Sequence, residues 1–140
     1  MESKIRLVIA DDDEDDCYLL ELALRSSNQN IEITTVPDAV QLFQFLESAT
    51  PPSVLILDLN LPLIDGFEVL KRLKSDDRLS TMAVIVITTS GVEADVKRAY
   101  QLGANAFITK PDVYSDLQKI IDSFSLFWFQ AARLPSPVNG

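Results

Sequence analysis

The chain has 140 residues, of which 47% are hydrophobic, enough for one domain with a substantial core. Its formal net charge of −9 argues against nucleic acid as a direct partner, and no apolar run approaches the roughly 20 residues that a membrane span needs. The single cysteine excludes a disulfide framework, and the absence of a signal peptide predicts a cytoplasmic location. Because the chain has no histidine, histidine-based sites are excluded, and any histidine chemistry must come from a partner.

Five apolar or β-branched stretches predict strands, and apolar residues at helical spacing predict a helix after each one. The predicted strands are Lys4–Ala10, Ile31–Val36, Val54–Leu57, Met82–Thr88 and Asn105–Thr109. The predicted helices are Cys17–Arg25 behind an acidic cap, two that begin at Asp38 and Gly66, one from about Val92 to Leu102, and one from near Asp112. This alternation predicts a flavodoxin-like, doubly wound α/β fold with a five-stranded parallel sheet in the order 2-1-3-4-5.

Polar residues follow the strands that such a sheet brings together. Asp11 and Asp12 follow the first strand, Asp58 follows the third, Thr88 ends the fourth and Lys110 follows the fifth. Open parallel sheets bind ligands beyond the carboxyl ends of their strands. Clustered carboxylates repel one another, and Mg²⁺ relieves that repulsion. A carboxylate nucleophile, a Mg²⁺ ion, a lysine and a hydroxyl are the parts needed to accept a phosphoryl group.

Four motifs lie at these strand ends. They are Ile-Ala-Asp11-Asp12, Leu-Ile-Leu-Asp58-Leu-Asn60-Leu-Pro62 with Asp65-Gly66, Ile-Thr88-Thr89-Ser90, and Phe107-Ile-Thr-Lys110-Pro111. Together and in this order they resemble the receiver domain of two-component response regulators, from about Lys4 to Phe124. Any single motif is weak, because one acid after a strand is usually a helix cap and one lysine before a proline is usually a surface turn.

The resemblance implies that Asp58 accepts a phosphoryl group from a partner histidine kinase. It implies Mg²⁺ bound by Asp11, Asp12, Asp58 and the backbone carbonyl of Asn60, phosphoryl contacts from Thr88 and Lys110, and a switch formed by Thr88 and Phe107. Asp11 and Asp12, the first two residues of the acidic run Asp11–Asp16, are the expected ligands because the apolar strand stops at Ala10. The family's usual cis peptide is expected at Lys110–Pro111. Self-phosphorylation and autodephosphorylation are the only catalytic activities expected.

The domain organisation predicted is a receiver domain over residues 1–124 and a C-terminal extension over residues 125–140. Since no output domain follows, we expect a single-domain response regulator that acts through protein contacts. Phe127, Trp128 and Phe129 crowd the extension, so we expect some of them to form a homodimer or partner contact. The alternative is that Trp128 and Phe129 fold back on their own domain. The extension also resembles that of regulators paired with cyanobacterial-type phytochrome kinases.

Two other functions fit parts of the pattern. A Mg²⁺-dependent phosphohydrolase of the haloacid dehalogenase type also uses an aspartyl nucleophile after a strand. That class requires Asp two residues after its nucleophile, where this chain has Asn60, and its nucleophile follows the first strand. An inactive pseudo-receiver, kept only for binding, is the third possibility, and the full set of site residues argues against it.

Overall fold

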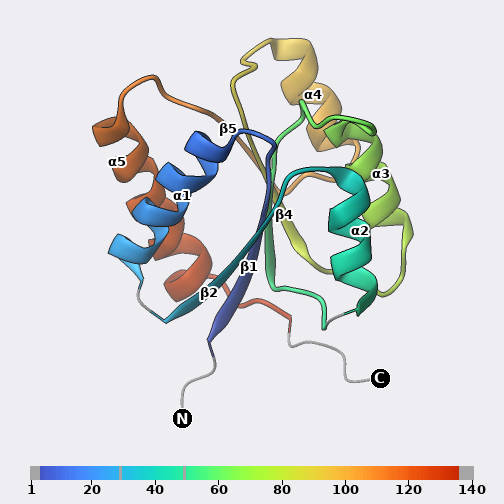
Figure 1. The fold of residues 1–140 in the computed structure, drawn as a ribbon, viewed down its shortest axis with the longest axis horizontal. Coiled ribbons are helices and arrows are strands. Elements are labelled where there is room, and N and C mark those ends of the chain that lie inside the picture. The colour runs from blue at the N-terminus through green and yellow to red at the C-terminus, as the bar shows by residue number, and fades with distance from the viewer. Residues whose placement is uncertain (1–3, 29, 49, 136–140) are drawn as a thin grey trace.

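The five predicted strands form one parallel sheet in the order β2-β1-β3-β4-β5, which confirms the predicted flavodoxin-like fold (Figure 1). A computed structural model describes residues 4–28, 30–48 and 50–135. The strands are β1 (Ile5–Ala10), β2 (Ile31–Val36), β3 (Val54–Leu57), β4 (Ala83–Thr88) and β5 (Ala106–Thr109). The first, fourth and fifth each begin one residue later than the apolar pattern predicts.

A helix follows each strand, and the helices cover both faces of the sheet. They are α1 (Glu14–Ser27), α2 (Ala39–Ser48), α3 (Gly66–Ser75), α4 (Glu93–Gln101) and α5 (Tyr114–Ser125). Helices α1 and α5 lie together on one face, and α2, α3 and α4 lie on the other (Figure 1). No helix among the described residues is long and apolar enough to cross a membrane.

The sheet separates two hydrophobic cores. Neighbouring strand residues point to opposite faces, so Leu7 belongs to the core under α1 and α5 whereas Val8 belongs to the core under α2, α3 and α4. Strand β3 is buried along its whole length because both of its faces are covered. Strand β2 mixes buried and exposed residues at one edge of the sheet, as its alternating sequence predicts.

The chain continues from α5 into a short π-helix, Leu126–Ala131, which carries the aromatic cluster of the extension. Trp128 and Phe129 pack against the core under α1 and α5. Leu126 and Phe127 remain 58% and 54% exposed. The aromatic residues are therefore divided: two cover their own domain, and Phe127 faces solvent. The predicted extension also includes residues 136–140, which lie outside the described part of the chain.

The expected cis peptide at Lys110–Pro111 is wrong. No cis peptide bond occurs among the described residues, so this bond is trans. The trans form is favoured by about 0.5–1 kcal/mol even before proline. In this form, the Lys110 backbone N–H donates to the Thr88 carbonyl at 2.7 Å, and the Lys110 side chain points back over the sheet edge to its carboxylate partners.

Candidate functional site

Asp58 lies directly after β3, at the carboxyl edge of the sheet, and is only 5% exposed. Its backbone N–H donates to the Ala10 carbonyl at 3.0 Å, which anchors it to the neighbouring central strand. The chain then turns tightly into α3. A Cβ at Gly66 would lie 2.6 Å from the Asp58 carbonyl oxygen and 2.5 Å from the Leu59 Cα, so only glycine fits there.

Three donors from separate parts of the chain converge on the Asp58 carboxylate. Its Oδ1 accepts hydrogen bonds from the Thr88 hydroxyl and the Asn60 backbone N–H, both at 2.9 Å. Its Oδ2 accepts from the Lys110 ammonium, also at 2.9 Å. Burial opposes ionisation of Asp58, but the Asn60 N–H and the Lys110 ammonium outweigh it and hold the pKa below its ordinary value. Asp58 is therefore an ionised, fixed carboxylate.

The Lys110 ammonium contacts three carboxylates at once. Its Nζ lies 2.7 Å from Asp11 Oδ2 and 2.7 Å from Asp16 Oδ2, in addition to its contact with Asp58. Burial alone would lower the pKa of Lys110, but hydrogen bonds to these acids raise it well above its ordinary value. Lys110 is therefore a permanent cation at the centre of the site.

Asp16 is the member of this cluster that the sequence analysis missed. The acidic residues on the first turn of α1 suit the positive end of a helix dipole, and they were predicted to serve only as a helix start. The structure separates them: Asp13 caps the helix by accepting from the Asp16 N–H, whereas the Asp16 side chain turns to Lys110. Helical geometry could have indicated this role for Asp16, because the third residue of a first helical turn can point back over the strand ends.

The two other predicted acids differ in environment. Asp11 is 4% exposed, and its Oδ1 accepts from the Asp13 backbone N–H at 3.0 Å. Burial raises the pKa of Asp11, although Lys110 and the Asp13 N–H partly offset it. Asp12 is exposed and lies with Asp11 along one surface depression bounded by α1 and the end of β2. The structure thus brings Asp11 to Asp58 through Lys110, whereas Asp12 lies beside Asp11 at the surface.

The donor set suits a hard divalent cation. Asp11, Asp12 and Asp58 supply carboxylate oxygens and Asn60 supplies a backbone carbonyl, which are the oxygen ligands that Mg²⁺ prefers. Burial of Asp11 disfavours its ionised form, a cost that a nearby cation would offset. In the part of the chain that the structure describes, no group of three or more acidic side chains is already arranged to hold a metal ion.

Phe107 lies on the edge strand β5, half-buried against the core under α2, α3 and α4. Its backbone N–H donates to the Tyr100 hydroxyl of α4 at 3.1 Å. Tyr100 is absent from the site predicted from the sequence, since nothing in the local pattern shows that its hydroxyl reaches a strand edge. The predicted switch residue is thus joined to α4 through its backbone.

Cys17, on the first turns of α1, is half-buried. Burial and the nearby Asp11 carboxylate raise the pKa of its thiol to about 12. Its Sγ lies 3.4 Å from the Asp11 carbonyl oxygen, to which the thiol donates. The protonated thiol therefore helps to position the end of β1 and is not a nucleophile at neutral pH.

Comparison with known proteins decides the family. The family described as "Response regulator receiver domain" matches residues 7–122 of this chain. The chain belongs to this family. This receiver domain is 32% identical over 136 residues to the response regulator Rcp1 of Synechocystis sp., with 93% of this chain and 92% of Rcp1 covered. The family assignment leaves no support for the haloacid dehalogenase alternative.

Solved receiver structures share the fold over almost the whole chain. The phosphorylated cyanobacterial phytochrome response regulator RcpA is similar with a TM-score of 0.91 at 35% identity, covering 96% of this chain and 100% of RcpA. The Mn²⁺-bound form of Rcp1 is similar with a TM-score of 0.87 at 32% identity, covering 94% of this chain and 99% of that chain. The receiver domain described here is thus similar to cyanobacterial phytochrome response regulators beyond the core receiver, into the extension after α5.

Proposed function

We propose that this receiver domain accepts a phosphoryl group on Asp58 from a phosphohistidine of a partner histidine kinase, with Mg²⁺ as the cofactor. The observation that carries the proposal is the environment of the Asp58 carboxylate. It is buried, held ionised, and surrounded by an ammonium, a hydroxyl and a backbone N–H from three separate segments. A helix cap or a turn aspartate needs no such set of partners.

In the proposed reaction an Asp58 carboxylate oxygen attacks the phosphorus. The new O–P bond forms as the P–N bond of the phosphohistidine breaks, and the electron pair of that bond stays on the imidazole nitrogen. Lys110 and Thr88 then donate to phosphoryl oxygens, because both already donate to the carboxylate that would carry them. Mg²⁺, held by Asp11, Asp12, Asp58 and the Asn60 carbonyl, would supply positive charge for the transferring group.

The proposed response begins at Thr88 and Phe107. The aspartyl phosphate adds roughly 1.5–2 negative charges. Thr88 is fully buried and bonded to Asp58, so a group growing on that carboxylate displaces its hydroxyl. Phe107 lies on the adjacent strand and is bonded to α4 through Tyr100. A shift of Thr88 would therefore reach the α4–β5 surface, where a downstream protein could detect it.

We further propose a phytochrome-like histidine kinase as the partner, and signalling in the cytoplasm through protein contacts alone. The similarity to RcpA, named as a phytochrome response regulator and solved in phosphorylated form, supports this partner. Residues 125–140 are proposed as a homodimer or partner contact separate from the receiver of residues 1–124. Phe127, with Leu126, offers the exposed apolar surface for it, whereas Trp128 and Phe129 support that surface from beneath.

The test is incubation with acetyl phosphate and Mg²⁺, followed by intact mass measurement. We expect one base-labile phosphate adduct on the wild type and on Asp15→Asn, and none on Asp58→Asn. Chelation of Mg²⁺ should abolish the adduct. If Asp58→Asn still formed the adduct, the phosphate would lie on another residue. Absence of any adduct on the wild type would favour the pseudo-receiver.

A further inference from the structure

Lys110 has no N–H to spare. An ammonium has three donors, and Lys110 uses them on Asp11, Asp16 and Asp58. If Asp58 receives a phosphoryl group, the new phosphoryl oxygens require at least one of these donors. The donor that now contacts Asp58 can follow the group onto its phosphoryl oxygens, and any second donor to that group must be taken from the contact with Asp11 or with Asp16.

Asp16 is the partner that Lys110 can leave at the lowest cost. The Asp11 side chain is 2% exposed and is held by the Asp13 N–H, and the Asp58 side chain is 7% exposed and is held by Thr88 and Asn60. The Asp16 side chain is 34% exposed, and its carboxylate accepts from no other described group. Water can therefore replace Lys110 as the partner of Asp16 but cannot easily do so for the other two acids.

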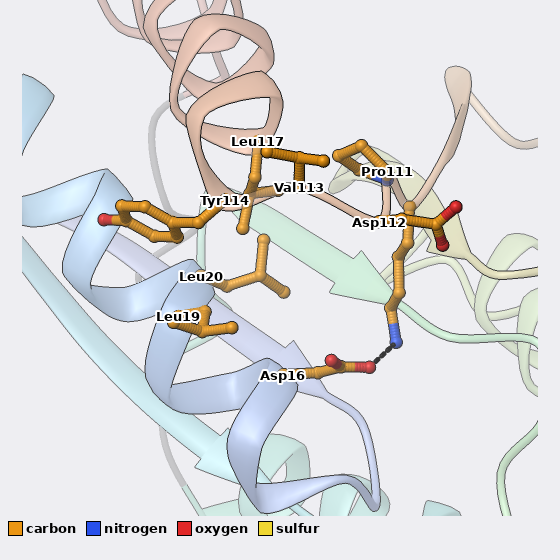
Figure 2. A pocket seen from close by; sticks show the side chains of 9 residues that line it. Asp16, Leu19, Leu20, Pro111, Asp112, Val113, Tyr114 and Leu117 are labelled. Carbon is orange, nitrogen blue, oxygen red and sulfur yellow. Dashed lines mark hydrogen bonds and ion pairs between the residues drawn. The ribbon is translucent and has the colours of Figure 1, made fainter.

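The surroundings of the pair leave room for this exchange. Asp16 and Lys110 border a cavity of about 120 Å³ between α1 and the start of α5. Figure 2 shows Asp16 at the lower edge of this cavity, paired with the ammonium, and Leu20, Val113 and Leu117 above it. Asp16 comes from α1 and Lys110 from the end of β5, so the ion pair joins two elements that are far apart in sequence.

We propose that Asp16 is a positioning residue that holds Lys110 back in the resting state and competes with the phosphoryl group for its ammonium. This inference rests on the proposed function of Asp58. It assigns to the first turn of α1 a role beyond the helix dipole: Asp16 sets how readily the site accepts a phosphoryl group. Removing its charge leaves Lys110 with fewer anionic partners and makes the lysine more available.

The experiment compares Asp16→Asn with Asp15→Asn. Both variants remove one charge from the same helical turn, but Asp15 is exposed and its side chain makes none of the contacts with Lys110. Each protein is titrated with beryllofluoride, a phosphoryl analogue, in the presence of Mg²⁺, and binding is followed by ¹H–¹⁵N NMR. We expect half-saturation of Asp16→Asn at a concentration about two- to fivefold lower than for the wild type, the range given by loss of a partly exposed ion pair. Asp16→Glu should stay near the wild type.

A second measurement needs neither metal nor analogue. The ¹⁵N-labelled Lys110 ammonium should give a resolved signal in the wild type because its hydrogen bonds slow exchange with water, and Asp16→Asn should broaden that signal while Asp15→Asn does not. Equal behaviour of Asp16→Asn and Asp15→Asn in the titration, or weaker binding by Asp16→Asn, overturns the role of Asp16. Failure of the wild type to bind beryllofluoride and to form the acetyl phosphate adduct overturns the proposed function itself.

Discussion

At the scale of single residues, the site depends on one cation among several acids. Lys110 offsets the mutual repulsion of Asp11 and Asp58 while both are buried. Folding keeps the pKa of Asp58 below its ordinary value of 3.8. Ionised Asp58 therefore contributes stability above pH 3.8, and that contribution is lost as the pH falls through the lowered pKa.

Lys110→Met should destabilise the protein and change how stability depends on pH. Without the ammonium, the buried carboxylates repel one another, which should cost about 3 kcal/mol at pH 7, as expected for a broken buried ion pair. Their pKa values should rise, so the folded variant would bind protons that the unfolded chain does not. The deficit should therefore shrink between pH 7 and pH 5. Urea unfolding at both pH values measures this, and an equal deficit at both would contradict it.

Thr88→Ala and Thr88→Ser together separate the role of the hydroxyl from that of the methyl group, because alanine lacks both groups whereas serine lacks only the methyl. The hydroxyl is fully buried and donates to Asp58 Oδ1, so its loss should cost about 1 kcal/mol and slow the phosphorylation of Asp58. Thr88→Ser keeps the donor and should retain most of the phosphorylation rate despite a small cavity. Acetyl phosphate reaction rates and thermal unfolding of the two variants measure the difference. Similar rates for Ala and Ser would show that the hydroxyl has no role in the reaction.

At the scale of elements, the approach of α3 to the end of β3 places Asp58. Gly66→Ala should cost about 1–3 kcal/mol, because its Cβ would meet backbone atoms that cannot move aside and would push the helix start from the site. Gly91→Ala is the matched control, since the nearest atom to its Cβ is 3.5 Å away. Thermal unfolding should separate the two, and the phosphorylation rate should fall only for Gly66→Ala. Equal losses would mean that the close approach is relieved elsewhere.

The strands and helices that meet at the carboxyl edge of the sheet could be predicted from the sequence. The side-chain contacts between those elements could not. Continuous apolar strands followed by Asp11, Asp58 and Thr88 predicted both the sheet and the convergence of these residues, because parallel strands end at one edge. The side-chain direction of Asp16 depends on Lys110, 94 residues away in the sequence. Such a contact leaves no local pattern, so the acidic run predicted only a helix start.

At the scale of the whole molecule, the extension shows the same limit. The number of aromatic residues in the extension predicted that one helix face could not bury them all. Which of them are buried and which face solvent depends on the π-helix. Phe129 packs on Phe124 with ring centroids 5.6 Å apart, and Phe127 packs on Trp128 from the solvent side. Nothing in the residue types distinguishes Phe127 from Phe129.

Phe127→Ala and Phe129→Ala should therefore separate self-association from stability. Phe129→Ala removes a ring from the core and should cost about 3 kcal/mol, whereas Phe127→Ala should change stability by less than about 1 kcal/mol. If the extension forms the proposed homodimer, Phe127→Ala should shift the protein to monomer. Chemical unfolding and sedimentation equilibrium measure the two effects. A wild type that is monomeric at all concentrations would rule out the dimer.

The two cores on opposite faces of the sheet have a consequence for how this protein can diverge from its relatives. A side chain such as Leu42 touches only the core under α2, α3 and α4, and Ile121 touches only the other. A substitution in one layer can be compensated within that layer, so each layer can accumulate changes without altering the other. Covarying core positions among relatives should accordingly fall within one layer and rarely across the sheet. The polar site residues Asp11, Asp58 and Thr88 belong to neither hydrophobic layer, and such freedom stops there.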